Sequence, residues 1–124
     1  MGARSITREA RYTPPMPIEK KRLDVRRFDA AKMQKLNLFE TGRFFLDVYC
    51  LEPGQAQKPH VHADSDKLYA VLEGAAEVTV GAERATLGPG EVVLAPAGVE
   101  HALENHGPGR AAVLTFAAPH THPK

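Results

Sequence analysis

Three histidines have the residue type and spacing that can do chemistry in this chain. His60 and His62 are separated by one residue, and His101 lies in a second short stretch bounded by turn residues. In a β-strand, residues two apart point to the same face, so the first two imidazoles can contact one ion. If His101 converges on them, three neutral imidazoles make a site suited to Fe, Zn, Cu, Ni or Mn, with open positions for water or substrate.

Glycine, proline and asparagine residues flank these histidines at characteristic spacings in the sequence. Gly54, His60, His62 and Gly74 are in register with the first motif of the cupin superfamily, and Gly90, Pro96, Gly98, His101 and Asn105 match the second motif at every position. The chain therefore resembles a small single-domain cupin over about residues 36–118. The resemblance implies a jelly-roll barrel with a divalent transition metal held inside, near one mouth, by His60, His62 and His101.

The first motif departs from the family pattern at Lys67, where metal-binding cupins have a glutamate ligand. In the family's register Lys67 and Tyr69 point inward. An ammonium group beside a divalent ion is unfavourable, so the site is metal-free, or Lys67 swings away, or it loses its proton. We favour a three-histidine site with Lys67 displaced toward Asp64, Asp66 or Glu100. Asp66 replaces the glutamate only if a bulge shifts the strand by one residue.

Three functions remain open, because a fold does not settle a function. The first is a dioxygenase-like or isomerase-like enzyme acting on a small molecule, with Tyr69 or Lys67 as candidates for acid or base work. The second is a non-catalytic protein in which Lys67 contacts an anionic small-molecule ligand. The third is a sensor domain that acts through a separate partner. The sequence names no substrate, reaction or metal.

Short strands alternating with Gly or Pro turns predict an all-β barrel. They cover residues 34–39, 43–51, 67–72, 76–80, 84–87, 91–94, 99–104 and 110–117, with a further short strand allowed at 23–28. We divide the chain into a basic, Pro-containing extended N-terminal arm (1–22), the barrel (23–118) and a C-terminal tail (119–124) that contains His120 and His122. Asn105 has a structural interpretation, and His106 is expected at the surface.

In the strand predicted at 43–51, only one face contains an acidic residue, and we use this to predict which face points into the barrel. Asp47 shares a face with Phe45, Tyr49 and Leu51, so we expect the alternate residues to point inward. These are Phe44, Leu46, Val48 and Cys50. We interpret Cys50 as core, with a soft ligand or reactive thiol as the alternative.

Composition narrows the partners and the compartment. A chain of 124 residues suits one domain, a single cysteine suits a reducing compartment, and no apolar run approaches the roughly 20 residues needed to cross a bilayer. We expect a cytoplasmic protein without a membrane partner. Residues 1–27 contain eight Lys or Arg and three acids. We expect no nucleic-acid partner, because acids are mixed among the basic residues and few aromatic residues are available to stack on bases.

A homodimer is expected from the strand at 67–72, which is apolar on both faces. Leu68, Ala70 and Leu72 lie opposite the inward-facing residues and need cover. A partner protomer provides it, with the N-terminal arm as an added edge strand. The alternative is that the chain's own arm folds over this face.

Overall fold

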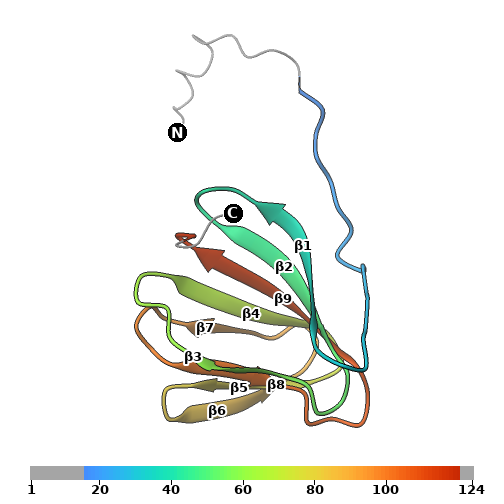
Figure 1. Ribbon diagram of the computed structural model, residues 1–124, viewed down its shortest axis with the longest axis vertical. Coiled ribbons are helices and arrows are strands. Elements are labelled where there is room, and N and C mark those ends of the chain that lie inside the picture. Colours follow the sequence, from blue (N-terminus) through green and yellow to red (C-terminus); the bar gives the residue numbers. More distant parts are fainter. Residues whose placement is uncertain (1–15, 121–124) are drawn as a thin grey trace.

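The protein is an antiparallel β-barrel, seen in a computed structural model that describes residues 16–120 (Figure 1). Nine strands and no helix occur within this range. The strands are β1 (Gln34–Glu40), β2 (Phe45–Leu51), β3 (Ala56–His60), β4 (Asp66–Glu73), β5 (Ala76–Val80), β6 (Glu83–Leu87), β7 (Val92–Ala95), β8 (His101–Glu104) and β9 (Ala111–Ala118). In the described part of the chain no helix is long and apolar enough to span a membrane. The all-β prediction is confirmed.

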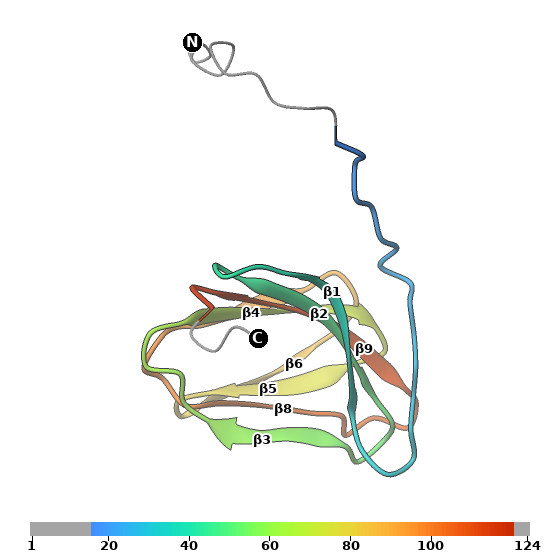
Figure 2. The same ribbon diagram turned by 45° about the horizontal axis from the view of Figure 1, so that its top comes forward.

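Two sheets face each other as the layers of the barrel (Figure 2). One has the strand order β1-β2-β9-β4-β7 and the other β3-β8-β5-β6. Strands far apart in the sequence are neighbours in both sheets, as in β2 beside β9 and β3 beside β8. This pairing brings the two histidine-containing stretches together, because His60 is the cross-strand partner of His101.

Most strands lie close to their predicted positions, but two segments differ. Residues 23–28 form no strand; Val25 and Phe28 instead pack as irregular chain on the outside of the five-stranded sheet. The strand β3 was absent from the predicted set, and it ends at His60. His62 therefore lies beyond the strand, in the loop that leads to β4. The tip of the arm and His122 lie outside the described residues.

Apolar side chains form two separate clusters, one on each face of the five-stranded sheet. The inner cluster fills the barrel with Tyr49, Leu51, Tyr69, Val71, Ala76, Val78, Leu87, Leu103 and Val113. The outer cluster contains Leu38, Val48, Cys50 and Ala112, with Val25, Phe28, Leu36, Phe39, Leu46, Leu72 and Leu114 packed against it. The sheet is apolar on both faces because both faces are covered over much of their area.

The predicted orientation of β2 is therefore wrong. Leu46, Val48 and Cys50 lie in the outer cluster, and Phe44 packs on Phe116 with ring centroids 5.5 Å apart. Asp47 points inward, where its carboxylate accepts a hydrogen bond of 2.8 Å from the Asn37 side chain. The presence of Asp47 did not identify the solvent-facing side of β2, because the Asn37 amide provides its carboxylate with a hydrogen bond at the edge of the barrel. Cys50 is buried away from the cavity and cannot be a ligand there.

Two residues of the family motifs have structural roles. Gly74, between β4 and β5, has a φ of +74°, and a Cβ there would collide with the carbonyl oxygen of Arg110. Asn105 is fully buried; its amide donates to the carbonyls of Leu51 (3.0 Å) and Gly109 (2.9 Å) and its oxygen accepts from the backbone of Gly107 (2.9 Å). The structural interpretation of Asn105 is confirmed.

Candidate metal centre

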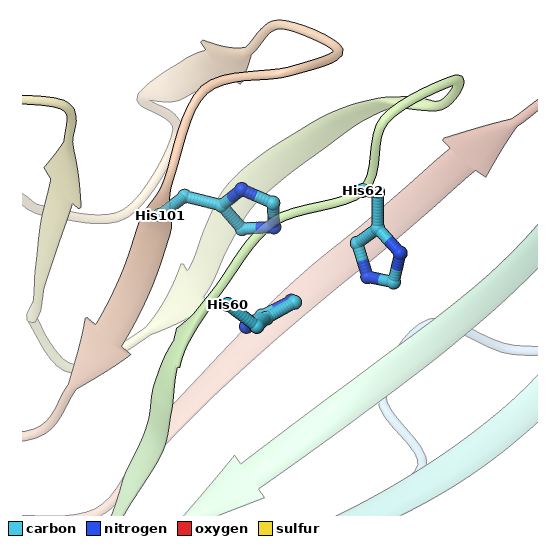
Figure 3. Close-up of side chains that lie close together, drawn as sticks. All are labelled: His60, His62 and His101. Carbon is cyan, nitrogen blue, oxygen red and sulfur yellow. The ribbon is translucent and has the colours of Figure 1, made fainter.

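His60, His62 and His101 point toward one another inside one end of the barrel (Figure 3). Each offers a ring nitrogen, and these three atoms all lie within 4.8 Å of one another. His60 closes β3 and His101 opens β8, so strand pairing sets their separation. His62 is positioned by its own backbone, whose carbonyl accepts a hydrogen bond of 2.8 Å from Gly98 in the turn before β8.

Backbone carbonyls select the tautomers of two of these rings. Nδ1 of His60 lies 2.8 Å from the carbonyl oxygen of Lys58, and Nδ1 of His101 lies 3.0 Å from that of Val99. A carbonyl only accepts, so each Nδ1 must hold the proton and each Nε2 must present a lone pair. This is the outer hydrogen bond that orients metal-bound histidines.

The Nε2 atom of His101 is buried and has no hydrogen-bond partner among the described residues. An unsatisfied buried acceptor costs about 1–3 kcal/mol, so such atoms need an explanation. Here the lone pair points to the other two histidines, where an ion would use it. The donor set therefore fits a transition metal.

Both rings are held in the neutral, ligand-ready form. Burial lowers the pKa of His60; the hydrogen bond to Lys58 opposes this, and the charge of Lys67 lowers the pKa further. Burial is also the main cause that lowers the pKa of His101, opposed by its hydrogen bond to Val99. Neutral imidazole is the form that binds metal.

Lys67 lies inside the barrel, as the family register predicted, and is only 2% exposed. Its Nζ lies 3.4 Å from Nε2 of His60 and sits 5.4 Å from the ring centroid of Tyr69. Burial lowers the pKa of Lys67 to about 8, with a further lowering by Lys35. The expected displacement toward Asp64, Asp66 or Glu100 is wrong, because the ammonium turns into the site.

Two other candidates take on positioning roles. The carboxylate of Asp66 accepts a hydrogen bond of 2.8 Å from the backbone of Ala97, which holds it outside the histidine cluster and rules out the one-residue shift. The hydroxyl of Tyr69 donates to Gln57 Oε1 at 2.6 Å, and burial raises the pKa of Tyr69. Tyr69 thus has its proton engaged in a structural hydrogen bond.

A cavity of about 440 Å³ opens beside the histidines, a size that suits a small molecule. Aromatic and apolar groups form part of its wall, and three lysines line it with no aspartate or glutamate among the lining residues. The lining is Lys35, Phe45, Tyr49, Gln57, Lys58, Pro59, His60, His62, Ser65, Lys67, Ala117, Pro119 and His120. The accessible wall is mainly apolar, and its charged groups are cationic.

Several residues of this cavity were not among the predicted site residues. Lys35 reaches the cavity from β1, where it is paired with Tyr49. His120 follows β9 and returns to the cavity, where its Nε2 lies 2.8 Å from Glu40. Nothing in the neighbouring sequence indicates that a lysine or histidine outside the motifs will line the cavity. Its position there depends on how the strands pair.

A second group of metal-ligating side chains lies on the outside of the four-stranded sheet. Glu77 and Glu104 are cross-strand partners, and His106 Nε2 is 3.0 Å from the first and 3.3 Å from the second. His106 is exposed, as predicted. Its Nε2 is already engaged by these two carboxylates at the protein surface.

Comparison with known proteins agrees with this architecture. The family model described as a cupin domain matches residues 47–117. TT1209 from Thermus thermophilus, a solved structure, is 45% identical, covers 82% of this chain and 98% of its own, and superposes with a TM-score of 0.80. Uncharacterized protein SCO3923 from Streptomyces coelicolor is 35% identical over 74 residues, which are 58% of this chain and 68% of that protein. An uncharacterized double-stranded beta-helix protein from Klebsiella pneumoniae, 24% identical with a TM-score of 0.76 over 85% of this chain and 93% of its own, supports the fold alone.

Proposed function

This chain belongs to the cupin family, and we propose that it binds one divalent transition metal (Fe, Mn, Zn, Ni or Cu) together with a small anionic molecule. His60, His62 and His101 are the ligands. The observation that carries the proposal is the buried Nε2 of His101, which lacks a partner among the described residues and points to the other two rings. A metal bound there supplies Lewis-acid chemistry and open coordination positions.

The anionic character of the ligand follows from the charges around the site. Three neutral histidines leave the ion with its full charge, whereas a glutamate at position 67 would have neutralised part of it. A divalent ion and the Lys67 ammonium about 5 Å apart repel by roughly 7 kcal/mol at an effective dielectric near 20, before relaxation. An anion between them attracts both cations and so offsets this repulsion. The cavity offers Lys35 and Lys58 for further contacts with such a group.

Two classes of activity are compatible with such a site. In an enzyme, dioxygenase-like or isomerase-like, Lys67 is the group placed to exchange a proton with the bound molecule, while Tyr69 holds Gln57 in position. In a non-catalytic binding or sensor protein, Lys67 only holds the anion. One contact supports the second class: Lys67 Nζ lies 3.4 Å from Nε2 of His60, which holds the ammonium at the site in position to contact an anion.

Metal analysis of protein purified without a histidine tag tests the proposal. We expect about one ion per chain and retention after dialysis. The double change His60→Ala with His62→Ala should abolish uptake and leave the circular dichroism spectrum unchanged, since a barrel of this size does not depend on the ion. His106→Ala is the matched control, because it removes an exposed imidazole from the second group. Equal metal content in all three proteins would refute the assignment.

Binding of small carboxylates tests the proposal that the cavity holds an anionic molecule. Calorimetric titration of the metal-loaded protein with acetate, oxalate and benzoate should show uptake that is lost in Lys67→Met, with the metal content retained. Benzamide is the neutral control for benzoate. Equal affinity for the acid and the amide would exclude an anionic ligand while leaving the metal site standing.

A further inference from the structure

The cavity beside the histidines has a closed end and a mouth. Phe45, Ala117 and Lys67 form one row across β2, β9 and β4, because Ala117 pairs with both of the others. Side chains alternate between the faces of a strand, so the next residue on the same face lies two positions away. Toward the core that residue on β4 is Tyr69, which is fully buried in the inner cluster. The mouth therefore lies on the other side of the row, where β4 begins and β9 ends.

Residues 119–120 cross this mouth directly after β9. The carbonyl of Pro119 accepts a hydrogen bond of 2.5 Å from the hydroxyl of Ser65, just before β4. On the β2 side, the backbone N–H of His120 donates to the carbonyl of Arg43 at 2.9 Å. Both Pro119 and His120 line the cavity. This short segment thus forms one wall of the mouth, and it belongs to neither histidine-containing motif.

The ring of His120 is held from two directions. Its Nε2 lies 2.8 Å from a carboxylate oxygen of Glu40, at the end of β1. A carboxylate only accepts, so this Nε2 holds a proton. The ring also meets Phe45 edge-on, with ring centroids 5.4 Å apart, and the His120 side chain is only 10% exposed. A ring fixed in this way gives the mouth a definite width.

The wall between the cationic group and the mouth is apolar. The Nζ of Lys67 lies 3.4 Å from Nε2 of His60, and this is where the anionic group of a ligand is received. From there the cavity wall continues toward the mouth along Phe45, Ala117 and Pro119, which have uncharged and mainly apolar side chains. An apolar tail attached to the anionic group gains free energy by lying along this wall, because its surface is removed from water.

We infer that the small anion of the proposed function is an acid with an apolar tail that lies along Phe45 and Pro119, and that His120 limits the length of this tail. The inference rests on the proposed function, because it requires the acid group to be held at Lys67. His120 is the residue that contacts the end of the tail. Glu40 is a positioning residue, which acts by holding the His120 ring in place.

Calorimetric titration of the full chain with straight-chain acids, from acetate to octanoate, measures the length limit. In the wild type we expect the affinity to rise about fourfold for each added CH₂ group until the tail reaches His120, and then to fall. His120→Ala should move the optimum to a longer acid, and His120→Trp should move it to a shorter one. His106→Ala is the matched control, because it removes an exposed histidine outside the cavity. The same optimum in all these proteins would overturn the inference.

Two changes at Glu40 separate the positioning of His120 from a general loosening of the barrel. Glu40→Ala removes the contact and should shift the optimum as His120→Ala does. Glu40→Gln keeps an oxygen that accepts from Nε2 and should restore the wild-type optimum. Equal shifts in Glu40→Ala and Glu40→Gln would overturn the positioning role.

The same titrations distinguish this inference from the proposed function. If acids bind with an affinity that does not depend on tail length, the inference fails and the anion site stands. If no acid binds to the wild type, both fail.

Discussion

Two histidine-containing groups on opposite sides of the four-stranded sheet have similarly spaced donor atoms but differ in burial and in hydrogen bonding. In the inner group, His60 and His101 are oriented by backbone carbonyls, and one Nε2 has no partner among the described residues. In the outer group, His106 is exposed and already lies against two carboxylates, Glu77 and Glu104. Similar donor spacing therefore has different consequences. A buried histidine with an unused lone pair gains a bond when a metal ion binds, whereas an exposed histidine that already contacts carboxylates gains little.

Removing one imidazole from each group should show the largest difference between the inner and outer groups. His101→Ala should lower the affinity for Zn or Mn at least 100-fold, because it removes the ligand whose lone pair is unused; roughly 100-fold corresponds to about 2.7 kcal/mol. His106→Ala should leave the affinity within about twofold. Competition with a chromogenic chelator measures both. A larger loss in His106→Ala would place the main site on the outer face.

Lys67 should have the next largest effect, because it sits where the inner group lacks a carboxylate. Metal affinity should rise in the order wild type, Lys67→Ala, Lys67→Glu: the first change removes a repulsion and the second also adds an oxygen ligand. Titration with Mn, Fe and Zn checks the order. The matched control is Lys58→Glu, which changes a more exposed lysine of the same cavity. Unchanged affinity in Lys67→Glu would contradict the geometry.

The stability of the metal-free protein should depend on pH through Lys67. Its pKa falls from 10.5 to about 8 on folding. At Lys67 the unfolded chain therefore binds more protons between these values, so this residue makes the free energy of unfolding rise as the pH increases above about 8. Above about pH 9.5 the opposite contribution of Tyr49 and Tyr69 begins, because burial raises the pKa of both and they lose protons more readily in the unfolded chain. The gain from Lys67 is of the order of 3 kcal/mol at most, at about 1.4 kcal/mol per pKa unit. Urea unfolding at about pH 7 and about pH 9 measures it below the range in which tyrosines ionise.

Lys67→Met is the control for this pH effect, since it keeps the aliphatic chain and removes the charge. The variant should be more stable than the wild type at about pH 7, and its stability should change less above about pH 8. A slope equal to that of the wild type would mean that another group causes the change.

The smallest expected effect concerns the outer group. An exposed ion pair contributes about 0.2–1 kcal/mol, so Glu77→Gln should change the free energy of unfolding by less than about 1 kcal/mol. Asn105→Ala is the contrasting change: it leaves the carbonyls of Leu51 and Gly109 without their donor and should cost about 2–3 kcal/mol. Urea unfolding of both variants compares the two. Equal losses would show that the buried amide is no more important than the surface pair.

Local patterns in the sequence determined the barrel, the turns and the three site histidines. Alternating strands with Gly or Pro turns predicted the all-β fold, and motif spacing predicted that His60, His62 and His101 would converge. The motif also placed Lys67 inside, since a strand's period of two transmits register from Gly74 along β4. The strands, the turns and each motif are local patterns, whereas the convergence of the two histidine-containing motifs was expected from the resemblance to a family in which both occur.

Tertiary structure alone decided which face of β2 is inside and what lines the cavity. Leu46, Val48 and Cys50 could equally have filled the barrel, because an alternating strand with two apolar faces has no preferred side. The choice depended on Asn37, which satisfies Asp47, and on Val25 and Phe28, which cover the outer face. Lys35 lines the cavity because it is paired with Tyr49 on the inner face of β2, the face that was assigned wrongly. His120 contacts Glu40 from the far end of the described chain, and such a long-range contact leaves no local pattern to detect.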